Sequence, residues 1–316
     1  MTFFDDNSSL PPDQQPPSPS PQESGSVGPS VSAEPQLSGD PITLAASVPS
    51  AVPSYSHKPA LPEDLQISWS WVHLVLFLFF GTVSLILVQA GFAIYYTPLH
   101  HFSNEQDFER FVLSKPAFAV GSMVLWYALI FLFLYVTLSV LRGAPFWRSL
   151  GWRNLAHRKV GWPRSPWIYL LAGFTLSFAV SIATAKMQPP ENVPIEELFR
   201  YRNTALLFMA MAVLIAPLVE ETVFRGYLYP LLAKYFGVAT GVLVTGVLFG
   251  LMHGAQLGWT WGLVSVLIVV GIIFTFVRAR TGSVFASFLL HLGYNSMIAV
   301  VSILGTKGFT KMPPAN

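Results

Sequence analysis

Long apolar segments dominate the chain after residue 66 and restrict its fold more than any other feature. Seven of them lie near residues 71–96, 117–141, 167–186, 204–235, 238–253, 259–277 and 284–304. Most are close to the ~20 residues that an α-helix needs to cross a bilayer. Over the whole chain 53% of residues are hydrophobic and only 11% are charged, whereas about 25% are charged in soluble domains. The sequence therefore predicts an all-α fold, a polytopic bundle of about seven transmembrane helices.

Residues 1–66 have a different composition. They hold 13 of the 25 prolines, many serines and glutamines, eight acidic residues and a single lysine, Lys58. Such a segment buries too little apolar surface to offset the entropy lost on ordering, so we expect a disordered acidic tail. Its start, MTFFDDNSS, is acidic where a signal peptide is basic, so the first apolar segment is expected to be an uncleaved anchor. The tail's charge of −7 leaves +9 on the remainder, because the whole chain carries +2. This surplus suits anionic lipid headgroups.

The distribution of cations predicts the topology. Six arginines and lysines and no acid lie in the loop of residues 142–166, so the positive-inside rule places this loop and the amino terminus in the cytoplasm. Tryptophans near the segment ends suit the interfacial belts, and His73 is expected at the interface as well. We expect a multi-pass protein of the plasma (inner) membrane of a bacterium. No nucleic-acid partner is expected.

Two adjacent acids interrupt the fourth apolar segment. Of the eight acids after residue 66, only Glu220 and Glu221 lie within such a segment. A carboxylate at the bilayer centre costs about 2.5–3.5 kcal/mol even on insertion scales, so both need a partner, water or a function. Glu221 and Arg225 are four residues apart and share a helix face, where they can neutralise each other. Glu220 points about 100° away and is expected to be the freer carboxylate.

Further polar residues are expected at the same depth. Pro217 should kink the helix just before Glu220, because it lacks a backbone N–H. Each of Glu220 and His253 lies 15 residues from the turn between their segments, a rise of about 22 Å. His291 reaches a similar depth, and Asn295 shares its helix face.

This set of residues suits peptide-bond hydrolysis, which requires a base for water and donors for the oxyanion. Glu220 with His253 is predicted to activate the water, and His291 with Asn295 to bind the oxyanion. Glu221 and Arg225 would brace the helix behind them.

The same residues resemble the motifs of the CPBP family of intramembrane proteases, also called the ABI family. This family includes the type II CaaX prenyl endopeptidases and bacteriocin-processing or immunity proteins. Its EExxFRGxL motif is matched by residues 220–228, FxxxH by Phe249 and His253, and HxxxN by His291 and Asn295. The resemblance covers about residues 204–304. It implies an endopeptidase of membrane-embedded or lipidated proteins and peptides, with catalytic Glu220, His253, His291 and Asn295.

The resemblance leaves the use of a metal open. The family was long classed as metalloproteases, and zinc held by Glu220, His253 and His291 is one alternative. The chain lacks the HExxH pair of helical zinc ligands, so a glutamate mechanism without a cofactor is favoured. The CaaX relatives have an eighth helix, whereas twelve residues follow Leu304 here.

The predicted organisation is a tail (1–66), three membrane helices (67–203), four catalytic helices (204–304) and a short end (305–316). Intramembrane Glu, Arg and His also mark proton-coupled transporters, which are the first alternative. Inverted-repeat transporters show paired interruptions in both halves, however, and here the polar residues fall in the second half. The second alternative is a family member that serves as an immunity or scaffold protein without cleaving a substrate.

Overall fold

The computed structural model describes residues 62–96, 102, 104–155, 161–185 and 198–310. The chain divides into two units, residues 1–56 and 57–316, and every described residue belongs to the second. Most of the predicted tail therefore lies outside the described residues, as do His100, His101, His157 and Lys186.

The described residues form helices and no strand. The 3₁₀ and π helices carry the label η, and the elements in chain order are η1 (Glu63–Leu65), α1 (Trp71–Tyr96), α2 (Glu105–Ser114), α3 (Pro116–Ala119), α4 (Gly121–Tyr135), η3 (Val136–Val140), α5 (Phe146–Ser149), α6 (Pro166–Thr184), η5 (Leu198–Arg200), α8 (Arg202–Glu220), η6 (Glu221–Leu228), α9 (Tyr229–Phe236), α10 (Val238–Met252), α11 (Trp261–Thr281) and α12 (Val284–Gly305). This confirms the prediction of an all-α membrane bundle.

Six apolar helical spans among the described residues are long enough to cross a membrane, and the predicted seventh is shorter. Helix α10 has 15 residues, a rise of about 22 Å against a bilayer core of about 30 Å. It ends because the chain turns back at once: the Trp259 N–H donates to the Gly254 carbonyl at 2.8 Å, and the Trp259 ring occupies the space beside Gly254. His253 caps this short helix, so its ring is held at the helix end.

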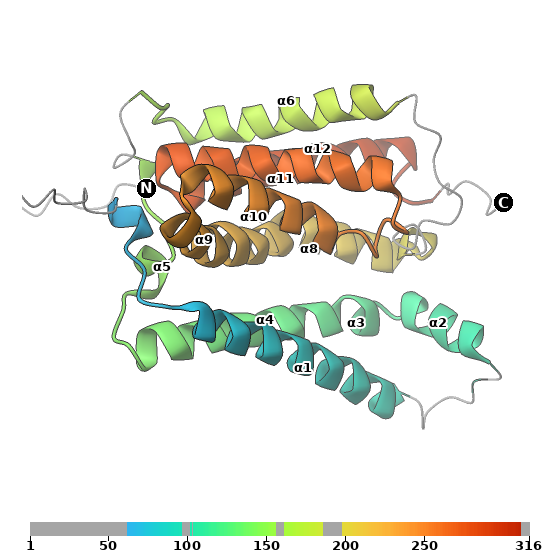
Figure 1. Ribbon diagram of the computed structural model, residues 1–316. Coiled ribbons are helices and arrows are strands. Elements are labelled where there is room, and N and C mark those ends of the chain that lie inside the picture. Colours follow the sequence, from blue (N-terminus) through green and yellow to red (C-terminus); the bar gives the residue numbers. More distant parts are fainter. Residues whose placement is uncertain (1–61, 97–101, 103, 156–160, 186–197, 311–316) are drawn as a thin grey trace, which may run out of the picture. The chain divides into compact units, whose positions relative to one another are not determined.

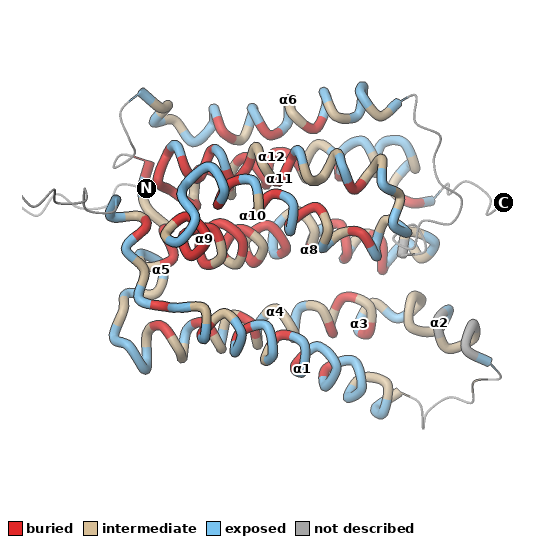
Figure 2. Tube along the Cα trace, viewed as in Figure 1, coloured by how far each residue is buried: buried red, intermediate tan, exposed pale blue. Residues whose placement is uncertain are grey.

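The helices pack in a definite order. Figure 1 shows α6 lying along α12, α10 along α11, and α1 alongside α4. Helix α8 continues through η6 into α9, and η6 contacts α8, α9, α10 and α12. Buried residues concentrate in η6, α9, α11 and α12, whereas α1 and α6 are mostly exposed (Figure 2). Such exposed apolar faces are those that lipid tails cover.

Two glycines allow α6 and α12 to touch through their backbones. A Cβ atom on Gly173 would lie 1.9 Å from the Leu290 carbonyl oxygen, and one on Gly293 would lie 2.0 Å from the Leu170 carbonyl oxygen. Small residues serve this purpose widely in membrane helices. Because Leu290 precedes His291, α6 sets the position of the helix that carries this histidine.

We predict that Gly173→Ala destabilises the protein by about 1–3 kcal/mol, the usual cost of overpacking. The matched control is Gly91→Ala in α1, where an added Cβ meets no atom within 4 Å, so that its stability should change by about 1 kcal/mol or less. Thermal unfolding in detergent measures both. Equal melting temperatures for the two variants would contradict the close packing of α6 on α12.

The structure corrects one expectation at the amino-terminal end and adds a contact for His73. The disordered tail was predicted to reach residue 66, but Glu63–Leu65 form a 3₁₀ helix and Leu65 is buried. Leu65 packs with Tyr229 and Ala279, which lie far away in sequence. His73, which was expected near the interface, is the third residue of α1 and is buried in the protein, where its Nδ1 lies 2.6 Å from the Tyr227 hydroxyl.

Candidate active site

The helix that carries the two acids changes its hydrogen-bonding pattern between them. α8 ends at Glu220, and the next eight residues, Glu221–Leu228, form the π-helix η6. Pro217 precedes the change by three residues and supplies no N–H to the helix. A kink was predicted here, and the structure shows a π-helix that begins four residues after the proline. π-helices are rare and occur frequently at functional sites.

Glu221 and Arg225 form a fully buried ion pair. Arg225 Nη1 lies 3.0 Å from Glu221 Oε1, and both side chains are 0% exposed. The other guanidinium nitrogens donate to the Thr275 hydroxyl at 3.1 Å and the Gly271 carbonyl at 2.9 Å. The guanidinium carbon also lies 4.3 Å from the centre of the Phe249 ring. A buried charge needs this degree of pairing to be tolerated.

His291 lies between the two acids. Its Nδ1 is 3.0 Å from Glu221 Oε1, and its Nε2 is 3.7 Å from Glu220 Oε2. An ionised carboxylate only accepts hydrogen bonds, so Nδ1 must carry a proton that it donates to Glu221. Nε2 then faces Glu220 either as an acceptor, in the neutral ring, or as a donor, in the doubly protonated ring.

Glu220 is the less constrained acid. Its side chain is 20% exposed, and within the described part of the chain it makes no hydrogen bond. Tyr127 of α4 packs against the cluster that contains Phe208 and Met211 of α8. Glu220 therefore combines access to its surroundings with one nearby imidazole.

Asn295 and His253 are held by backbone carbonyls. Asn295 Nδ2 donates to the Ala212 carbonyl at 2.8 Å, which joins α12 to α8 and leaves the second amide hydrogen unused by this bond. His253 Nδ1 lies 2.8 Å from the Phe249 carbonyl oxygen. The Phe249 ring contacts both imidazoles, with centroid distances of 4.9 Å to His253 and 5.7 Å to His291.

The structure thus brings Glu220, Glu221, Arg225 and His291 into direct contact and places His253 beside the shared Phe249 ring. Among the described residues His253 forms no ion pair with a carboxylate. The expected Glu220–His253 partnership is therefore not a direct contact in this conformation.

The donor set does not fit a metal ion in this arrangement. In the part of the chain that the structure describes, no three His, Asp or Glu side chains gather closely enough to hold one. Glu221 Oε1 is already shared by Arg225 and His291. The alternative zinc set of Glu220, His253 and His291 is not assembled.

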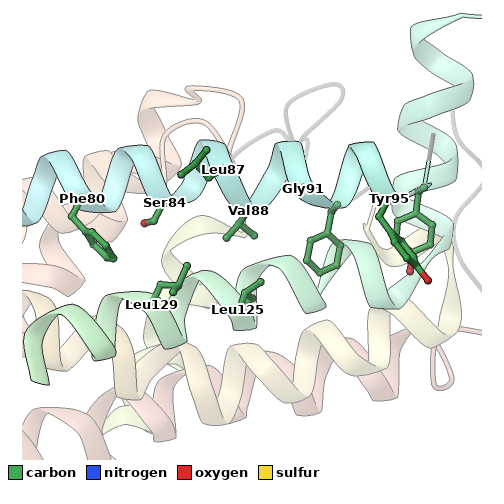
Figure 3. Close-up of a pocket in the computed structure, with 10 residues that line it drawn as sticks. Phe80, Ser84, Leu87, Val88, Gly91, Tyr95, Leu125 and Leu129 are labelled. Atoms are coloured by element: carbon green, nitrogen blue, oxygen red, sulfur yellow. The ribbon is translucent and has the colours of Figure 1, made fainter. Parts of the chain in front are cut away.

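A separate apolar cavity of about 650 Å³ lies between α1 and α4 (Figure 3). It is lined mainly by Phe80, Leu87, Val88, Leu125 and Leu129 and contains no carboxylate, imidazole or cation. Its polar groups are the hydroxyls of Ser84, Tyr95 and Tyr96, without a carboxylate or imidazole beside them. The chemistry is therefore sought at Glu220.

Three features of the site were not predicted. The first is the contact of His291 with both acids, since the sequence assigned Glu221 to Arg225 alone. The second is the pair of hydrogen bonds from Arg225 to the Thr275 hydroxyl and the Gly271 carbonyl. These acceptors carry no charge, so the charge pattern of the sequence does not indicate them. The third is the packing of Tyr127 against α8; Tyr127 lies outside the motifs, and an aromatic hydroxyl in an apolar helix was its only signal.

Comparison with known proteins agrees with the motifs. Residues 202–297 match the family model described as "Type II CAAX prenyl endopeptidase Rce1-like". This confirms the resemblance to the CPBP family over those residues, and at family level it supports a CAAX-type intramembrane protease. No curated protein and no solved structure gives a significant match to the chain.

Proposed function

We propose that this chain, which carries the type II CAAX prenyl endopeptidase match in residues 202–297, is an endopeptidase that cleaves membrane-embedded or lipidated proteins or peptides. The observation that carries the proposal is the difference in burial and pairing between two adjacent acids. Glu221 is fully buried and paired, whereas Glu220 is partly exposed and lies 3.7 Å from an imidazole nitrogen. A general base needs this access to water.

In the proposed mechanism Glu220 accepts a proton from a water molecule as the water oxygen attacks the scissile carbonyl carbon. The carbonyl oxygen becomes an oxyanion, which takes hydrogen bonds from His291 Nε2 and from the second Asn295 amide hydrogen. Donation by Nε2 requires the doubly protonated ring, because Nδ1 already carries the proton that it donates to Glu221. The C–N bond then breaks as Glu220 returns the proton to the leaving amine.

His253 is proposed to assist from the rim of the site. Its Nδ1 is bound to its own helix, so Nε2 is the atom available to the water or the substrate. A water molecule between Nε2 and Glu220 would connect the two side chains without a direct contact. Glu221 and Arg225 contribute by fixing His291 and do not touch the substrate.

The membrane placement is part of the proposal. The helices make the protein an integral multi-pass membrane protein. We infer from the arginines of residues 142–164 that the amino terminus is cytoplasmic, in the inner membrane of a bacterium. The lipid bilayer is then a direct partner.

The test is cleavage of membrane-anchored peptides by the purified full chain in proteoliposomes. We predict cleavage that is unchanged, within about twofold, by a zinc chelator, since the proposed base requires no metal. Loss of cleavage on chelation with recovery on adding zinc would instead favour the metal mechanism. Absence of cleavage together with proton-coupled solute uptake would favour a transporter.

A further inference from the structure

Residues 62–70, here called the strap, fasten the chain before α1 to the catalytic helices. Asp64 Oδ2 lies 3.1 Å from Arg278 Nη1, and these side chains are 7% and 1% exposed. Leu65 is buried beside Tyr229 and Ala279. The strap therefore has both a buried ion pair and an apolar anchor, which distinguishes it from a solvated linker.

Exposed charges hold the beginning of the strap. Glu63 lies 3.1 Å from Arg153 and 3.4 Å from Arg148. The hydrogen bond from Arg153 lowers the pKa of the Glu63 carboxyl below its usual value, so this acid stays charged near neutral pH. Arg142 donates to the Ser68 carbonyl. Most of these cations belong to the arginine-rich segment between α4 and α6.

The end of the strap binds the π-helix of the candidate site. The Trp69 Nε1–H donates to the Tyr227 carbonyl at 3.1 Å, and the two rings stack with centroids 5.3 Å apart and planes 23° apart. His73, at the start of α1, approaches the Tyr227 hydroxyl. Tyr227 and Trp69 are both buried. Tyr227 is thus held at its backbone, its ring and its hydroxyl by residues outside 202–297.

The contacts of Tyr227 with Trp69 and His73 affect the geometry of the π-helix η6. Returning η6 to ordinary i→i+4 bonding would rotate Tyr227 by about 100° relative to Glu221, one residue's rotation. Tyr227 could not then keep its contacts with the strap while Glu221 keeps those with His291. The contacts at the two ends of η6 therefore select the π geometry together.

We propose that the strap holds η6 in this geometry and that Trp69 is a positioning residue of the site. The proposal rests on the proposed function only in its effect on cleavage. Without the strap, Glu221 and Arg225 lose the fixed position from which they orient His291, and Glu220 loses its aligned imidazole.

The test compares Trp69→Phe with the matched control Trp71→Phe in the full chain in proteoliposomes. Phe keeps an aromatic ring at position 69 and removes the N–H donor. Trp71 lies two residues on and contacts Tyr235 and Phe236 at the end of α9, outside η6. The hydrogen-exchange rate is measured for peptides that span residues 221–228 and is compared with the rate for peptides from α6.

Trp69→Phe should raise exchange in residues 221–228 about three- to tenfold, as expected for one lost buried hydrogen bond, and leave α6 unchanged. It should also lower kcat about tenfold at an unchanged KM, because positioning and not substrate binding is affected. Trp71→Phe should do neither. If Trp69→Phe does not fold, Asp64→Asn provides the same comparison from the other end of the strap.

Unchanged exchange in residues 221–228 in the Trp69 or Asp64 variant, equal to that in Trp71→Phe, would overturn the proposal. Raised exchange with unchanged kcat would overturn the positioning role. If the unmodified protein cleaves no peptide, the proposed function fails, whereas the exchange comparison still decides whether the strap holds η6.

Discussion

Glu220→Gln should lower the rate of peptide cleavage by about 10²–10⁴-fold, the usual contribution of a general base. Glutamine keeps the size of the side chain but cannot accept a proton from water. Folding should be retained, with a change of about 0.5 kcal/mol or less, because Glu220 is partly exposed and its ion-pair contact with His291 is a long one of 3.7 Å. The measurements are the cleavage rate in proteoliposomes and the melting temperature in detergent.

The neighbouring acid is the informative comparison. Glu221→Gln should lower the stability of the protein, because Glu221 is fully buried and accepts hydrogen bonds from both Arg225 and His291. Its loss of activity should therefore accompany a lower melting temperature. Full activity in Glu220→Gln would refute the assignment of Glu220 as the base.

Local spacing predicted the parts of the site that depend on one helix. The i, i+4 relation of Glu221 and Arg225 predicted their pairing, and counting residues from the turns placed Glu220 and His291 at one depth. The Glu221–Arg225 pair exists, at 3.0 Å, as the spacing of four residues on one helix predicts. Glu220 Oε2 and His291 Nε2 lie 3.7 Å apart, a contact for which the count supplied only the similar depth that the constant helical rise gives.

Features that depend on distant residues were not predictable in the same way. The π-helix is defined by which carbonyl accepts the hydrogen bond of each N–H. The contacts of Tyr227 with Trp69 and His73 contribute to that hydrogen-bonding pattern. Asp64 and Arg278, which form an ion pair, lie 214 positions apart in the sequence. Asp64 belongs to residues 1–66, whose composition predicted a disordered tail. The early end of α10 depends on how Trp259 packs on Gly254. Periodicity carries no information on such packing.

Arg225→Met should cause the largest loss of stability, about 3–5 kcal/mol, the cost of leaving a buried charge without its partner. The change removes hydrogen bonds to Glu221, Thr275 and Gly271, while methionine roughly fills the space beside Phe249. The free energy of unfolding can be measured by steric trapping in bicelles. Arg280→Met is the matched control, because Arg280 is exposed one residue before the end of the same helix that supplies Thr275 and Gly271, and about 0.5 kcal/mol is expected there.

The double variant Glu221→Gln with Arg225→Met separates charge from packing. If the unpaired carboxylate causes the loss, removing it should make the double variant more stable than Arg225→Met by about 0.5–3 kcal/mol, the range of coupling between contacting residues. Cleavage should stay low in the double variant, because His291 has then lost the carboxylate that fixes its Nδ1 proton. A double variant no more stable than Arg225→Met would show that Arg225 acts through its bonds to Gly271 and Thr275. If Arg225→Met is as stable as Arg280→Met, then neither the ion pair with Glu221 nor the hydrogen bonds to Thr275 and Gly271 hold η6 against α11.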